Sequence, residues 1–355
     1  MNKYVKRYLI DAMSGMAQGL FASLLIGTII KTLGQQLLRL SENIVFKFIV
    51  DAGSFATDPH VVGAAMAVGI GFAMQVPALV LFSLVAVGSA ANVTGGAGGP
   101  LAVLFIAIIS AELGNLVSKK TKVDIIVTPA VTILVGSLLT VLTAKYIGLA
   151  ASSLGNVIVW ATTLRPFIMG ILISTIVGIA LTLPISSAAI CAAFGLTGLA
   201  GGAAVAGCCA QMVGFAVLSF RENRWGGLLS QGIGTSMLQM PNIVKNPRIW
   251  LPPTLAGIIT GPIATCIFKM EMNGPAVSSG MGTCGLVGQI GVITGWFNPS
   301  ETAIAHGAQA ISPTVFDWLG LILICFVLPA LLSFAFGLIF RKLEWIKEGD
   351  LLLGE

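Results

Sequence analysis

The residues best suited to chemistry in this chain are neutral amides and hydroxyls, which gather in two glycine-rich segments. Residues 225–244 read WGGLLSQGIGTSMLQMPNIV and residues 272–300 read MNGPAVSSGMGTCGLVGQIGVITGWFNPS, and neither contains a charged residue. Amides and hydroxyls donate and accept hydrogen bonds, which suits a small polar ligand without charge. We therefore expect the segments to bind a substrate through Gln231, Thr235, Ser236, Gln239, Asn273, Ser278, Ser279 and Thr283.

These polar side chains could instead form hydrogen bonds with one another and with the backbone of a broken helix.

Two smaller patches add binding candidates. Asn92 stands before the sequence GGAGGP, and Ser186 follows Pro184. A proline breaks a helix, and a hydroxyl just after it can cap the next helix. A cap that faces a cavity can also hold a polar group of a ligand.

Two ionisable residues are candidates for a proton or ligand contact. Glu112 stands seven residues before Lys119, which is about two helical turns from the expected membrane interface. Its carboxylate either contacts a ligand or a proton, or it only extends toward Lys119 and Lys120 at the membrane surface. His306 could titrate near neutral pH, or it is a hydrogen-bonded neighbour of a loop.

The absence of known motifs argues against metal, nucleotide and protease chemistry. The six cysteines lie in apolar stretches, none forms CxxC, and none has a histidine at metal-binding spacing. The chain has no GxxxxGK[ST], GxSxG or HExxH motif, so neither an ATP-driven pump nor a zinc protease is supported. We expect no metal, no cofactor and no catalytic residue in this chain.

The elements that position these residues must cross a membrane. The 355 residues include only 19 Lys and Arg and 14 Asp and Glu, so a soluble enzyme, a nucleic-acid binder and a disordered chain are excluded. A membrane-spanning helix needs about 20 mainly apolar residues. The charge-free gaps 59–111 and 166–220 each have room for two spans, and most other gaps hold one. We predict an all-α polytopic membrane protein with about 8–10 transmembrane helices.

The two polar segments do not read as ordinary spans. Irregular backbone at membrane depth is tolerated only against protein or a watery cavity. We therefore interpret 225–244 and 272–300 as re-entrant hairpins or broken helices, which are typical of transporter binding sites. Residues 34–57 and 144–165 mix apolar and charged residues and are predicted to be amphipathic arm helices.

Basic residues predict the orientation. They cluster at 3–7, 119–122, 221–224, 245–248 and 341–347. Cytoplasmic loops carry an excess of Lys and Arg, so we expect both termini in the cytoplasm. No clean cleavage site follows the basic N-terminus, so 12–33 is predicted to be a retained first span.

Three stretches carry a resemblance to a known family. They are PFIMGILISTIVGIALTLPISSAAI (166–190), KVDIIVTPAVTILVGSLLTVL (122–142) and QGIGTSMLQMPNIVKNPRIWLPPTLAGIITGPIATCIF (231–268). Together they resemble the membrane subunit, IIC, of bacterial sugar phosphotransferase systems, in a divergent form of the fructose and glucose superfamily pattern. The resemblance implies an elevator-type permease that works as a homodimer in the bacterial cytoplasmic (inner) membrane.

The resemblance also implies a division of the chain. Residues 1–355 would form one IIC-like membrane domain, with a scaffold part at about 1–165, a transport part with the hairpins at about 166–315 and a last span at 317–341. The chain carries no IIA or IIB domain, so any phosphocarrier partners would be separate proteins.

The chain departs from the family pattern at one place. The family has an acidic residue in the re-entrant segment where this sequence reads Gly234-Thr235-Ser236-Met237. That residue hydrogen-bonds sugar in the family, so its absence leaves the substrate of this chain open. Two alternatives therefore stand beside a sugar permease. One is an ion- or proton-coupled secondary transporter, and the other is a membrane regulator that senses a ligand.

Overall fold

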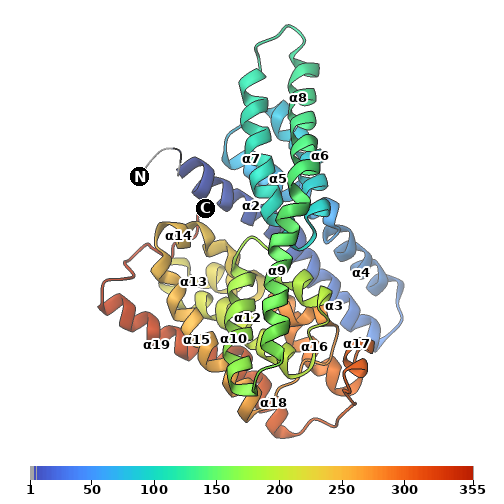
Figure 1. The fold of residues 1–355 in the computed structure, drawn as a ribbon, viewed down its shortest axis with the longest axis vertical. Helices are drawn as coiled ribbons and strands as arrows, with labels where there is room; N and C mark the ends of the chain where they lie inside the picture. The colour runs from blue at the N-terminus through green and yellow to red at the C-terminus, as the bar shows by residue number, and fades with distance from the viewer. Residues whose placement is uncertain (1–3, 5, 355) are drawn as a thin grey trace. The chain divides into compact units, whose positions relative to one another are not determined.

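The computed structural model describes residue 4 and residues 6–354, and these residues form helices and turns with one isolated bridge, between Gly198 and Met272. The chain divides into two compact units, residues 1–151 and 152–355. Figure 1 shows the course of the chain through both. The boundary between the units falls inside the helix α9 (Lys145–Thr162).

The first unit consists of long apolar helices. A helix from Lys6 to Arg39 opens it. Asn43 and Asp58 accept hydrogen bonds from the first turns of the two helices that follow, and Pro59 opens the second of these. α5 packs on α2 and α6, while α6, α7 and α8 contact one another (Figure 1). The elements are η1 (Lys6–Asp11), α2 (Ala12–Leu20), η2 (Phe21–Leu25), α3 (Ile26–Leu40), α4 (Ile44–Ala56), α5 (Pro59–Ala73), α6 (Ala78–Gly95), η3 (Gly96–Gly98), α7 (Gly99–Val117), α8 (Asp124–Leu139), η4 (Thr140–Ala144) and α9 (Lys145–Thr162).

The second unit is built around one buried helix, α12 (Gly198–Leu218). Its sequence is mostly Gly and Ala, and small residues let neighbouring helices approach closely. α10 (Pro166–Thr182), α15 (Leu251–Pro262) and α19 (Leu328–Lys342) all pack against it. A side chain at Gly207 would collide with the carbonyl of Ser174 on α10, so this approach requires glycine.

Shorter elements surround these helices. They are α11 (Ser187–Ala193), α13 (Phe220–Leu229), η5 (Ser230–Gly234), η6 (Ser236–Gln239), α14 (Met240–Lys245), η7 (Pro247–Trp250), η8 (Ile263–Ile267), η9 (Ala276–Gly280), η10 (Cys284–Leu286), α16 (Val287–Phe297), α17 (Glu301–Ala305), α18 (Val315–Ile322) and η11 (Leu323–Val327).

The prediction of an all-α polytopic membrane protein is confirmed. Within the described residues, six helices are long and apolar enough to cross a membrane, or seven if the bent pair α4 and α5 is one span. Two of the six, at 78–117 and 124–162, are about twice as long as one crossing needs. The first of these contains α6 and α7, which fold back on each other. The number of helices long enough to cross a membrane is below the predicted 8–10, because gaps such as 166–220 also contain shorter helices.

Both polar segments contain interrupted helices, as predicted. Between η5 and η6 the backbone of Thr235 is extended, with φ −159° and ψ 144°. Within η10, directly before α16, Gly285 and Leu286 adopt left-handed backbone angles, with φ 52° and 59°. Residues 34–57 form the end of α3 and all of α4, which pack together. Residues 145–162 continue the long helix that begins at Asp124.

Candidate functional site

The two interrupted segments meet beside the buried helix α12. η5 of the first segment contacts η10 of the second, and η5, η6 and η9 all contact α12. The fold therefore brings together two sets of polar residues that lie about 40 positions apart in the sequence. The hydrogen bonds of each set show how much of its polar capacity the protein itself uses.

Three buried amides form the centre of the first set. Gln239 Nε2 donates to Gln231 Oε1 at 2.9 Å, and Asn242 Nδ2 donates to Gln239 Oε1 at 2.8 Å. Gln231 Nε2 donates in turn to Ser219 Oγ at 2.8 Å. The side chains of Gln231 and Gln239 are completely buried.

The C-terminal segment 345–353 completes this arrangement. Gln239 Nε2 donates to the carbonyl of Leu351 at 2.9 Å, and Asn242 Nδ2 donates to that of Leu352 at 2.8 Å. Two further amides hold the same segment: Asn223 binds Leu351 and Leu353, and Asn246 binds Trp345 and Asp350. We call Asn223, Gln231, Gln239, Asn242 and Asn246 the amide clamp. Its hydrogen-bonding groups are engaged by the protein's own chain.

A second series of hydrogen-bonded side chains links η6 of the first segment to α10 and α12. Ser236 Oγ lies 2.7 Å from Thr182 Oγ1, which donates to Gln211 Oε1 at 3.3 Å. Gln211 also accepts from Trp250 Nε1 at 3.0 Å and donates to Thr254 Oγ1 at 3.0 Å. Sequence reasoning missed Thr182 and Gln211. Gln211 could have been found from the sequence, because it is the one amide inside the Gly- and Ala-rich stretch that forms α12.

Several predicted hydroxyls support backbone. Thr235 Oγ1 accepts from the N–H of Met237, and Ser186 Oγ accepts from that of Ala189, so both cap the elements that follow them. The capping role expected for the hydroxyls after Pro184 is confirmed at Ser186. Ser279 Oγ donates to the carbonyl of Leu196 at 2.6 Å, which ties η9 to the chain just before α12.

Two other hydroxyls of the second segment are buried against α12 or within their own segment. Thr283 Oγ1 lies 3.5 Å from the sulfur of Met212 on α12. Ser278 is buried and packs close to Gly291.

Asn273 is a predicted site residue that keeps a buried oxygen without a partner among the described residues. Its Nδ2 donates to Glu271 Oε2 at 2.8 Å, but its buried Oδ1 has no hydrogen-bond partner among the described residues. A small cavity of about 60 Å³ adjoins it, lined also by Lys269, Trp296 and Asp317. An unsatisfied buried acceptor costs about 1–3 kcal/mol, so this oxygen is ready to accept a donor.

The remaining predicted residues lie elsewhere. In the first unit, Glu112 accepts from Arg7 at 2.8 Å, and the side chain of Asn92 donates to the carbonyl of Pro59. From the sequence alone, Lys119 and Lys120 are the cations toward which Glu112 would extend, whereas the structure pairs it with Arg7. In the second unit, His306 is exposed, and its Nδ1 lies 3.2 Å from Thr197 Oγ1.

The described residues build no metal centre, and the buried thiol of Cys191 is held in an unreactive form. In this part of the chain, no three His, Cys, Asp or Glu side chains are grouped to hold a metal ion. Burial raises the pKa of the Cys191 thiol to about 12, so at neutral pH it remains the protonated, unreactive form.

The two ends of α12 differ in charge. Its first residue, Gly198, pairs with Met272, next to Asn273. At its last residue, the carbonyl of Leu218 accepts from Arg341, which is also 2.6 Å from Glu222. Arg248 lies over the ring of Trp345 at the same end. Basic clusters separate in sequence thus share one end of this unit, as expected if they lie on one side of a membrane.

A family model described as "Phosphotransferase system, EIIC" matches residues 10–353, which is nearly the whole chain. No curated protein and no solved structure matches the chain.

Proposed function

The chain belongs to the EIIC family of the phosphotransferase system, and from this premise we propose that it carries a small neutral polar solute across the bacterial inner membrane. The family and the apolar helices establish a multi-pass membrane protein of the phosphotransferase permease type. The solute class, its binding site and the transport motion are our proposals.

The unsatisfied carbonyl oxygen of Asn273 is the observation that carries the binding site. A solute hydroxyl that donates to Oδ1 would remove the cost of that buried acceptor. Glu271 offers carboxylate oxygens beside it, and Trp296 offers an apolar ring, which suits the C–H groups of a sugar or polyol. Glu271 also supplies an acidic group near the substrate, although the segment 234–237 has none.

The size of the cavity supports a moving transport part. Ligand pockets usually measure about 300–1,000 Å³, and the cavity beside Asn273 has about 60 Å³. The chain at Asn273 would therefore have to separate from α16, which carries Trp296, before a solute could enter. The contacts of η5, η6 and η9 with α12 favour a rigid-body motion of residues 166–315, in which both segments move with that helix.

Partners follow from the family. We propose a homodimer that works with separate IIA and IIB phosphocarrier proteins, which would meet the chain at the basic end of α12. Proton coupling through Glu112 is less well supported, because its carboxylate is already engaged by Arg7.

Solute binding to the purified protein tests this proposal. We expect at least one neutral monosaccharide or polyol in a panel to raise the melting temperature. Asn273→Ala should weaken binding of that compound about tenfold, which corresponds to about 1.4 kcal/mol. Asn156→Ala is the matched control, because Asn156 is an exposed asparagine away from the cavity. Equal affinity in Asn273→Ala and the wild type would show that this site is wrong.

A further inference from the structure

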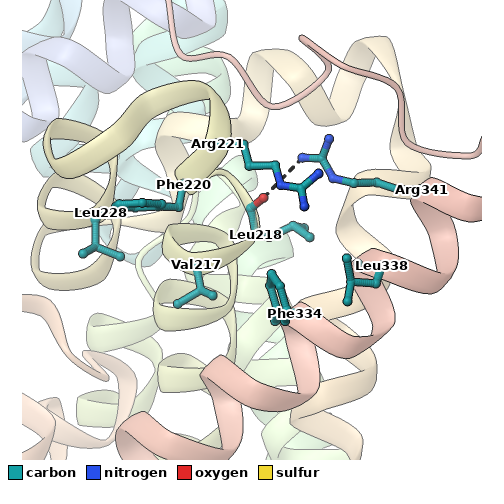
Figure 2. A pocket seen from close by; sticks show the side chains of 9 residues that line it. Val217, Leu218, Phe220, Arg221, Leu228, Phe334, Leu338 and Arg341 are labelled. Atoms are coloured by element: carbon teal, nitrogen blue, oxygen red, sulfur yellow. Dashed lines mark hydrogen bonds between the residues drawn. The ribbon is translucent and has the colours of Figure 1, made fainter.

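A second cavity lies at the basic end of the second unit. Its volume is about 240 Å³, and it lies between the end of α12, α13 and α19 (Figure 2). The walls are apolar and consist mainly of Val217, Leu218, Phe220, Leu228, Phe334 and Leu338. An apolar cavity of about 150 Å³ stays dry and takes up apolar molecules. This larger one is therefore suited to a hydrocarbon group.

Two arginines reach the same cavity. Figure 2 shows the guanidinium groups of Arg221 and Arg341 converging on it from opposite elements. Arg341 is held by Glu222 at 2.6 Å and by the carbonyl of Leu218 at 3.3 Å. Arg221 is exposed, and none of the described residues accepts a hydrogen bond from it.

The local charges leave a cationic site. Glu222 neutralises Arg341 through Oε1, while its Oε2 is buried and has no partner among the described residues. Lys342 adds positive charge next to Arg341 in the sequence. Two guanidinium groups that face one another repel unless an anion lies between them, and Arg binds phosphate oxygens in a bidentate way.

We propose that this cavity binds an anionic phospholipid of the surrounding bilayer. The phosphate lies against Arg221 and Arg341, and an acyl chain lies between Phe334 and Leu338. These two side chains are each 44% exposed on α19, which belongs to the apolar helix Val315–Lys342, so the cavity opens along a surface that a membrane would cover. Basic pockets at the ends of membrane-spanning helices are suited to lipid head groups.

A phospholipid fits better than a free phosphate because of the walls. Phosphate alone would leave six apolar side chains in contact with water or empty space, whereas a chain of CH₂ groups gains about 0.8 kcal/mol for each group buried. The head group and the chain thus address different parts of one cavity.

Native mass spectrometry of the purified full chain tests the proposal. The protein would be incubated with phosphatidylglycerol or with phosphatidylcholine of the same chain length. We expect the wild type to retain phosphatidylglycerol preferentially and Arg221→Gln to reduce this retention about tenfold. Arg224→Gln is the matched control and should retain the lipid as the wild type does. Because Arg221 is exposed, Arg221→Gln should melt at the wild-type temperature, which separates lost binding from misfolding.

Two further measurements examine the apolar part and the source of the phosphate. Phe334→Ala should weaken retention of phosphatidylglycerol while both arginines remain. Glycerol phosphate, which has the charge but no chain, should not displace the lipid at equal concentration. Equal retention of both lipids by the wild type, equal losses in Arg221→Gln and Arg224→Gln, or displacement by glycerol phosphate would each overturn the assignment.

Discussion

Gln239 shows how a buried amide is made stable at the scale of a single residue. Both of its polar atoms are used, since Nε2 donates to Gln231 and Leu351 and Oε1 accepts from Asn242. Each partner is itself buried or partly buried, so none could turn to water if Gln239 were shortened. The amide clamp therefore stabilises the C-terminal segment and the first interrupted segment together.

Gln239→Ala is expected to lower the free energy of unfolding by about 1–3 kcal/mol, because it leaves the buried Gln231 Oε1 without a partner and removes one of the two hydrogen bonds made by each of Leu351 O and Asn242 Nδ2. Thermal unfolding of the purified variant in detergent measures the loss. Gln309→Ala makes the same substitution at an exposed position and should melt with the wild type. A variant of Gln239 as stable as the wild type would show that water or neighbouring groups replace the lost hydrogen bonds.

The residues of the site were partly predictable. Charge-free runs of amides and hydroxyls identified Gln231, Gln239 and Asn273 as buried polar groups that need partners. The sequence could not show that Leu351, 112 positions from Gln239, would supply one of those partners. It also could not single out Asn273, because an unsatisfied oxygen is a property of packing. Whether these residues bind a solute stays a prediction.

At the scale of elements, the close approach of α10 and α12 depends on glycine. The position of Gly207 is filled by the backbone of Ser174, and Gly261 on α15 makes a similar approach to α10. Small residues at helix contacts replace the hydrophobic driving force that is missing within a membrane.

Gly207→Ala should therefore separate α10 from α12 and destabilise the protein strongly, with a loss of about 1–3 kcal/mol or more from overpacking. Gly226→Ala is the matched control, because nothing lies within 4 Å of a side chain added there and its backbone angles allow alanine. The two melting temperatures check this expectation. If Gly207→Ala melted like Gly226→Ala, α10 and α12 could move apart at little cost.

The elements were predicted best where they are long and apolar. Charge-free gaps indicated the helices at 78–117 and 315–342, and the abundance of polar residues indicated the two interrupted segments. Boundaries inside a gap were harder to predict. The gap 166–220 contains the full-length α12 but also the seven-residue α11, since Ser186 caps a new helix after the break at Pro184. Hydrophobicity does not reveal such a break.

At the scale of the whole molecule, the basic residues of the second unit gather at one end of α12, near Leu218, and the other end of that helix begins at Gly198. α12 is about 31 Å long, close to the thickness of the hydrocarbon core. The helix from Val315 to Lys342 runs to the same basic end, where Arg341 binds Glu222. The loop before Val315 should therefore lie on the other side of the membrane from the C-terminal segment.

Cysteine labelling in intact cells tests this orientation. After replacement of the exposed Cys266 by serine, Gln309→Cys should react with a membrane-impermeant maleimide added outside. Lys347→Cys should react only after the membrane is opened, because the positive-inside rule places it in the cytoplasm. Both positions are exposed, so access to the side chain does not limit either reaction. Labelling of both from outside would contradict the proposed topology.

The enclosure of α12 also has a consequence for how this protein can vary among its relatives. Protein surrounds this helix along nearly its whole length, so a larger side chain has no lipid to extend into and a new polar group has no water to reach. Most single substitutions there should be lost by selection, whereas the exposed apolar positions of α8 should exchange freely among apolar residues. Homologous sequences should therefore keep the small residues of α12 even where the solute they carry has changed.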